Sequence, residues 1–161
     1  MKLKKVLSFV VLTALCLLTF AGCGDNGKEK ISSMMSEVTG IKYKDGEYTA
    51  TANDYDDQGY KATVTVLVRD GEVRSVDCNA VNKDGQKKKQ LSEEGKYSMK
   101  AGGAKYEWHE QIARFEEYVV AHGTDSVSIK SDQKTDVITG CTIKVKEYVD
   151  LVNKALSKAR M

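Results

Sequence analysis

The segment YKATVTVLVRDGEVRSVDCNAV, residues 60–81, decides the fold class of this chain. Its first half places an apolar side chain at every second position, at Val64, Val66 and Val68. Its second half repeats the alternation with Val76, Cys78 and Ala80. Asp70 and Gly71 stand between the halves, and an Asp-Gly pair favours the tight turn of a hairpin. The segment therefore predicts two antiparallel strands with one buried face.

Strand patterns continue on both sides of this hairpin. Upstream, residues 45–54 (DGEYTATAND) predict a strand that carries Tyr48, Ala50 and Ala52 on one face. Downstream, residues 125–129 (DSVSI) predict a short strand. Between the hairpin and that strand, residues 82–105 predict a polar loop without regular structure, in which the run Lys87, Lys88 and Lys89 is solvated.

Two helices complete the prediction. In residues 106–123 apolar side chains recur at steps of three and four and Gly123 supplies the stop: Trp108, Ile112, Phe115 and Val119. Residues 143–159 predict a second helix with the apolar face Val145, Tyr148, Val152, Ala155 and Ala159. Strands followed by helices indicate an α+β domain, a small antiparallel sheet with two packed helices.

The N-terminus is typical of an exported protein. A cationic start is followed by an apolar run from Val6 to Phe20, which is shorter than the ~20 residues that span a bilayer. The run ends in FAGC, residues 20–23, which resembles the lipobox of bacterial lipoproteins and predicts lipidation of Cys23. We therefore expect a lipoprotein signal at 1–22, a polar tether at 23–44 and one domain at 45–161. An ordinary cleaved signal with an incidental cysteine is the alternative.

Removal of the signal changes the charge balance. The chain has 25 Lys and Arg against 23 Asp and Glu, and the signal takes three lysines and no acid, which leaves 22 against 23. A nearly neutral exported protein has no electrostatic basis for binding nucleic acid. We therefore expect no nucleic-acid partner.

Few residues of the mature chain suggest catalysis. His109 lies among core positions of the first helix and His122 stands next to its terminal glycine, where a cation is favoured without any ligand role. No zinc-ligand spacing, nucleophile elbow or phosphate-binding loop is present, so we expect no metal and no catalytic residue. Cys78 and Cys141 either form a disulfide or are two small buried side chains.

The segment DVITGCTIKV, residues 136–145, is the candidate functional site. We expect Thr142 at the start of the last helix, where free backbone N–H groups and the helix dipole favour a phosphate. Val145 stands where a capping box needs Glu or Gln. Thr139 and Gly140 provide a close turn. Thr142 is then either a plain helix cap or the attachment point of a phosphate group.

Three segments together resemble the FMN-binding domain of exported bacterial flavoproteins, over about residues 45–159. They are DGEYTATA, TVTVLVRDGEVRSVDCNA and TDVITGCTIKVKEYVDLVNKAL. That family carries an Asp-x-x-(Ser/Thr)-Gly-Ala-Thr motif whose last threonine receives FMN through a phosphoester. Asp136, Thr139, Gly140 and Thr142 match it, and Cys141 replaces the alanine.

The resemblance implies a function and its partners. A flavin transferase, using FAD and magnesium, would attach FMN to Thr142, and a membrane-bound donor would supply electrons. Tyr60 and Met99 are the candidates to line the flavin ring, whereas Trp108 is assigned to core packing. We expect a lipid-anchored electron carrier on the outer face of the cell membrane. The alternative is a non-redox surface lipoprotein that uses the same fold to bind a ligand or a partner.

Overall fold

The hairpin at residues 60–81 is the centre of the sheet. The structure, a computed structural model, describes residues 43–161, so the predicted signal, Cys23 and the tether up to residue 42 lie outside it. Three strands pair antiparallel in the order β1-β2-β3: β1 (Gly46–Thr51), β2 (Tyr60–Arg69) and β3 (Glu72–Asn82). Asp70 and Gly71 both have positive φ, 57° and 77°, as the two central residues of the predicted tight turn require.

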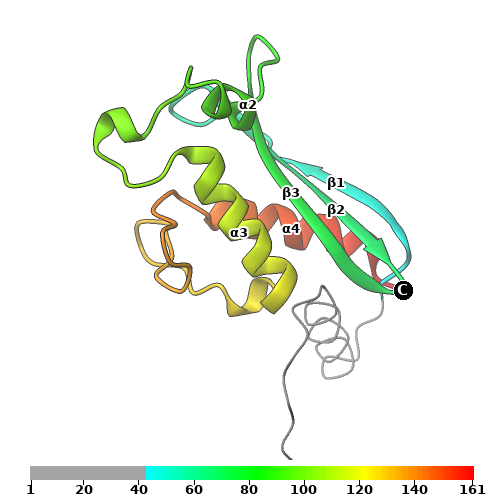
Figure 1. Cartoon of the computed structure of the whole chain (residues 1–161). Helices are drawn as coiled ribbons and strands as arrows, with labels where there is room; N and C mark the ends of the chain where they lie inside the picture. The colour runs from blue at the N-terminus through cyan, green and yellow to red at the C-terminus, as the bar shows by residue number, and fades with distance from the viewer. Residues whose placement is uncertain (1–42) are drawn as a thin grey trace, which may run out of the picture.

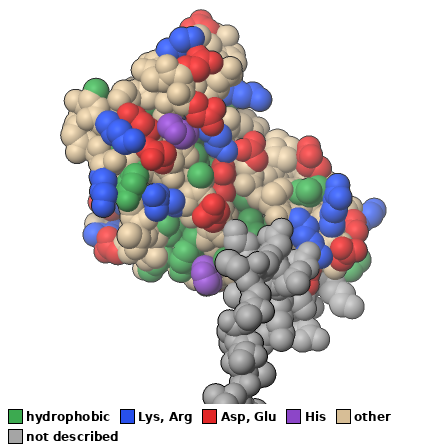
Figure 2. Space-filling view, in the orientation of Figure 1, with side chains coloured by type: hydrophobic (Ala, Val, Ile, Leu, Met, Phe, Trp, Pro, Cys, Tyr) green, Lys and Arg blue, Asp and Glu red, His purple; other side chains and the backbone are tan. Residues whose placement is uncertain are grey.

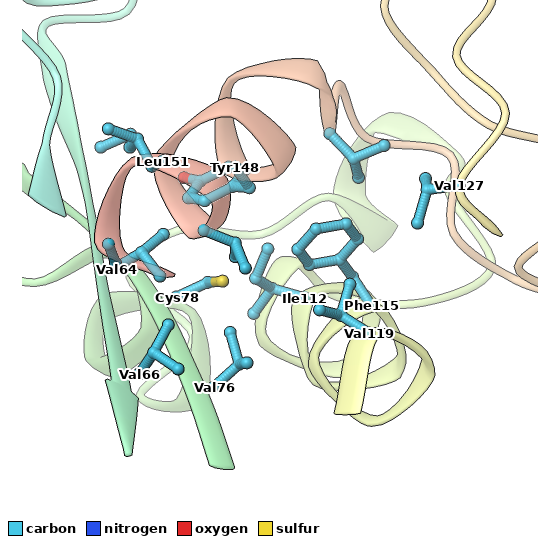
Figure 3. Packing of buried hydrophobic residues seen from close by; sticks show 14 of the residues in the cluster. Val64, Val66, Val76, Cys78, Ile112, Phe115, Val119, Val127, Tyr148 and Leu151 are labelled. Atoms are coloured by element: carbon cyan, nitrogen blue, oxygen red, sulfur yellow. The ribbon is translucent and has the colours of Figure 1, made fainter. Parts of the chain in front are cut away.

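Helices α3 (Trp108–His122) and α4 (Lys146–Ala159) cover one face of the sheet, which confirms the predicted α+β class (Figure 1). Helix α4 packs on β1 and β2, and α3 packs on β3. The alternating apolar side chains of the hairpin point into the layer between sheet and helices, where Cys78 lies near Ile112 (Figure 3). On the other face Thr49 and Thr65 pair through their hydroxyls at 3.1 Å.

The segment predicted as a loop, residues 82–105, contains two short helices, α2 (Lys88–Glu93) and η1 (Lys100–Gly102). The prediction that the lysine run 87–89 is solvated is also wrong for its central residue, because Lys88 is only 5% exposed. Its ammonium lies 4.5 Å from the ring centres of both Tyr60 and Tyr97 and donates to Gln58 Oε1 at 2.9 Å. Aromatic faces attract a cation, so this side chain turns inward.

The predicted strand at residues 125–129 does not form. Residues Thr124–Ser126 make a single 3-10 turn, η2, and no strand pairs with the residues that follow it in the described chain. Val127 is buried in the core cluster without sheet pairing, and its N–H bonds within the turn to the Thr124 carbonyl at 3.0 Å. Val127 and the partly buried Ile129, which packs against the core, produced the apolar signal, and two such residues are too few to define a strand.

The two ends of the described chain meet. Tyr43 forms an antiparallel bridge with Arg160, and the Lys44 N–H donates to the Ala159 carbonyl at 2.7 Å. Residues 43 and 44, which the sequence assigned to the tether, are therefore bonded to the domain. Figure 1 shows this end of the domain beside the β2–β3 turn.

The surface carries no extended region of one charge on the face drawn in Figure 2, where basic and acidic side chains are interspersed. Within residues 43–161 no helix combines the length and the apolar character needed to cross a bilayer.

Candidate functional site

Thr142 lies four residues before α4, which corrects its predicted position at the helix start. The helix begins at Lys146 with Val145 as its N-cap residue, so Thr142 is outside the first turn and outside the reach of the helix dipole. In the segment before the helix every second side chain is buried, Cys141, Ile143 and Val145, while Thr142 and Lys144 are exposed. This two-residue period belongs to extended chain.

Gln111 of α3 holds Thr142 in place. Its side-chain carbonyl accepts hydrogen bonds from the Thr142 backbone N–H at 2.7 Å and from the Thr142 hydroxyl at 3.0 Å. Its amide donates to the Tyr106 carbonyl at 2.8 Å. Gln111 is 1% exposed and comes three residues after Trp108, on the apolar stripe of α3. Sequence reasoning missed it, although a polar residue at core spacing was the available signal.

Gly140 allows the loop to approach α3 closely. Its φ is +80°, and a Cβ built on it would lie 2.7 Å from a ring carbon of Tyr106 and 3.5 Å from Arg114 Nε. The Arg114 guanidinium lies over the same Tyr106 ring, 4.2 Å from its centre. A glycine is needed here for both the backbone conformation and the contact. The close turn expected at Thr139–Gly140 is therefore present, and Tyr106 and Arg114 are its partners.

Cys141 and Cys78 are both free and buried. Of the two alternatives left by the sequence, the structure has two small core side chains. Burial raises the pKa of the Cys141 thiol to about 11 and that of the Cys78 thiol well above its usual value. Both thiols are therefore protonated at neutral pH. Cys141 points into the core while its neighbour Thr142 is exposed, so the exchange of alanine for cysteine leaves the hydroxyl accessible.

The remaining motif residues lie at the surface. Asp136 is exposed and pairs with Lys130 at 3.2 Å, and Thr139 is exposed as well. Asp136 thus has a loop partner of its own rather than a bond to Thr142. The exposed position of Thr139 makes it a suitable comparison for Thr142 in experiments.

The two candidates for the flavin ring lie in different clusters. Met99 Sδ is 3.6 Å from Gln111 Nε2, which places Met99 in the same network as Thr142. Tyr60 packs edge-on against Tyr97, with ring centres 6.0 Å apart, in the cluster around Lys88. Trp108 is buried, as expected for core packing, and its ring centre lies 5.6 Å from the Lys88 ammonium. Trp108 and Gln111 are neighbours on α3, so the first turn of that helix contacts both clusters.

The first turn of α3 is itself fixed by the middle loop. The Glu107 carboxylate accepts from the Met99 N–H at 2.6 Å and from the Ser98 hydroxyl at 2.8 Å. Ser92 Oγ lies 3.0 Å from His109 Nδ1 and accepts from the His109 backbone N–H at 3.2 Å. These contacts give residues 92–107 a structural role in supporting the helix that carries Gln111.

An open pocket of about 410 Å³ lies elsewhere, against α2. Its lining residues are Gly85, Gln86, Lys87, Gln90, Leu91, Glu94 and Lys96, and none of them is a predicted site residue. The loop that carries Thr142 lies outside this pocket.

The chain resembles proteins of known structure. It is 46% identical to a Clostridium thermocellum protein studied by solution NMR, with a TM-score of 0.55 over 71% of this chain and 91% of that one. The two proteins belong to one family. A Clostridium perfringens protein with a crystal structure is 26% identical, with a TM-score of 0.58 over 73% of this chain and 88% of that one. No protein-family model and no curated protein matches the sequence. The comparisons assign the family no activity, so function is argued from the site.

Proposed function

We propose that this protein is a membrane-anchored flavoprotein that carries FMN, linked to Thr142 through a phosphoester, for electron transfer outside the cytoplasm. The observation that carries the proposal is the Thr142 hydroxyl, which is exposed and yet fixed by a fully buried side chain, Gln111. A residue that only capped a helix would have no need of such a support, and Thr142 precedes no helix directly.

The surroundings of Thr142 suit a phosphate ester. Gly140 lets the loop lie close to α3, and the buried Nε of Arg114 beside it has no hydrogen-bond partner. The Thr142 hydroxyl donates its hydrogen to Gln111, so the lone pairs of its oxygen are not used in that bond. After esterification the Thr142 N–H still donates to Gln111, so the loop keeps one of its two bonds to α3.

Attachment requires a second protein. In this proposal Thr142 Oγ1 attacks the flavin-side phosphorus of FAD, the pyrophosphate bond breaks and AMP leaves. The hydroxyl proton passes to a base of the flavin transferase. The partner of the hydroxyl here is Gln111, an amide that does not accept a proton at neutral pH. The chain is thus an acceptor of the group and not its own catalyst.

Bound FMN would supply the one- and two-electron chemistry, and the protein would supply placement. Gln111 and Gly140 fix the attachment point, and Met99, in contact with Gln111, is the nearer of the two ring candidates. A membrane-bound donor would deliver the electrons.

Coexpression of the full chain with a flavin transferase tests the proposal. Trypsin cuts after Lys134 and Lys144, so residues 135–144 leave as one peptide that contains Thr142. We expect this peptide to gain the mass of an FMN ester, and we expect no gain without the transferase. The transferase must load its own acceptor in the same cells. A colourless protein with an unmodified peptide would contradict the proposal and favour the non-redox binding module. If flavin copurifies but is lost on denaturation, the protein binds FMN without the ester bond to Thr142.

The lipid anchor at Cys23 is part of the same proposal, and FAGC at residues 20–23 supports it. Cells that express the full chain with a clickable fatty acid should label the wild-type protein. Cys23→Ala removes the sulfur that forms the thioether and should abolish labelling. Cys16→Ala, within the apolar run, is the matched control and should label like wild type. Label that persists in Cys23→Ala rules the anchor out.

A further inference from the structure

Arg114 and Gln111 stand side by side toward the Thr142 loop. They are three residues apart on α3 and therefore share a face of the helix. Gln111 binds Thr142, and Arg114 Nε lies 3.5 Å from the position a Cβ of Gly140 would take. One helix face thus presents to this loop both a hydrogen-bond partner for the hydroxyl and a permanent cation.

The cation lacks an acidic partner. Arg114 forms no ion pair within residues 43–161, and its Nε is the one buried side-chain nitrogen or oxygen there without a hydrogen bond. Glu110, one turn earlier, is the natural partner, but its carboxylate binds Lys100 at 2.7 Å and the Glu107 N–H at 2.7 Å. A buried donor left unpaired is destabilising, and a bound anion that accepts from it would remove that cost.

The guanidinium of Arg114 has donors beyond its buried Nε. Its centre lies 4.2 Å from the centre of the Tyr106 ring, and its Nη atoms are not among the buried unpaired atoms of residues 43–161. Nε and the adjacent Nη form a fork that matches two oxygens of a phosphate. Lys105 lies 5.3 Å from the same ring centre, so a second cation adds to the positive potential around Tyr106. A Cβ on Gly140 would lie 2.7 Å from a ring carbon of Tyr106 and 3.5 Å from Nε, so glycine is what allows the loop to lie this close to Arg114.

We propose that Arg114 is the anion receptor of this loop and binds a phosphate group beside Gly140 through its Nε edge. The identification of that phosphate with the ester on Thr142 rests on the proposed function, whereas the receptor itself rests on Arg114. The helix dipole cannot serve this purpose, because α4 begins only at Lys146. In this proposal Arg114 binds the phosphate that the sequence predicted at the N-terminus of the last helix.

Titration of the full chain, in detergent and without flavin, with inorganic phosphate tests the receptor. The probe is the Arg114 Nε–H resonance in proton–nitrogen NMR, and sodium chloride at equal ionic strength is the reference. We expect a saturable shift with phosphate and none with chloride. Arg114→Gln should abolish saturable binding, and Arg114→Lys, which keeps the charge but loses the fork, should weaken it about tenfold. Lys105→Gln, the control on the same ring, should bind within about threefold of wild type.

A second arm identifies the source of the phosphate. In flavin-loaded protein the site should already be filled, so inorganic phosphate should no longer shift the Arg114 resonance. The two proposals fail separately. Absence of a saturable shift in the unloaded wild type, or an equal shift with chloride, overturns the receptor whether or not flavin attaches. A saturable shift in a protein that never accepts flavin retains the receptor and removes the ester. If loaded protein still binds inorganic phosphate, the site serves free phosphate and not the ester.

Discussion

Replacing Thr142 with valine should leave a folded chain that carries no covalent flavin. Valine nearly keeps the shape of threonine and removes the only oxygen that the ester could use at this position. The side chain is exposed and the backbone N–H still donates to Gln111, so we expect the free energy of unfolding to fall by less than about 1 kcal/mol. The mass of the 135–144 peptide, after coexpression with the transferase, measures the outcome.

Two matched variants make this result specific. Thr139→Val changes an exposed threonine in the same peptide and should lower the yield of attachment without abolishing it. Cys141→Ala introduces the alanine of the motif that this segment resembles and should load at least as well as wild type. An FMN ester that persists on the peptide of Thr142→Val would show that another residue accepts the flavin, and the central assignment would be wrong.

Gln111→Leu should destabilise the domain by about 3 kcal/mol. Leucine fills a similar volume but offers no polar atom, so the Tyr106 carbonyl and the Thr142 N–H each lose a partner. An unpaired polar group that becomes buried costs ~1–3 kcal/mol. The Thr142 loop would also lose both of its bonds to α3, so the yield of flavin attachment should fall with stability. Urea unfolding of the full chain measures the first effect and peptide mass the second.

The control for this variant is Gln90→Leu. Gln90 is exposed on α2 and its amide binds Glu94 at 3.1 Å, so its loss should change the free energy of unfolding by no more than ~0.5 kcal/mol. If Gln111→Leu also changes the free energy of unfolding by no more than ~0.5 kcal/mol, the hydrogen bonds of Gln111 to Tyr106 and Thr142 do not stabilise the domain.

The sheet and the first long helix could be predicted because their signals are local. Alternation along residues 60–81 and the Asp-Gly turn define the hairpin without reference to the rest of the chain. The helix of Trp108, Ile112 and Phe115 follows from its spacing in the same way. The start of the last helix was misplaced because Val145 was counted in the helical face, whereas its burial continues the two-residue alternation of Cys141 and Ile143.

The rest depends on contacts between distant segments. Lys88 is buried because Tyr60, Tyr97 and Trp108 surround it. Three consecutive lysines have no local pattern from which the burial of the middle one could be predicted. The bond between Gln111 and Thr142 joins residues 31 positions apart. The sequence placed the candidate segment at the start of the last helix, whereas it lies in the loop before that helix, and the residues that support it became visible only in three dimensions.

The meeting of Tyr43 and Arg160 places the start of the described chain at the C-terminal end of α4. The chain enters at the C-terminal end of α4, whereas the Thr142 loop lies before its N-terminal end, and 14 helical residues separate the two by ~20 Å at about 1.5 Å per residue. With Cys23 in the membrane as proposed, helix α4 acts as a rod that holds the flavin away from the lipid. A donor embedded in the bilayer would then have to reach the end of the domain opposite residue 43, whereas a soluble acceptor meets the flavin directly.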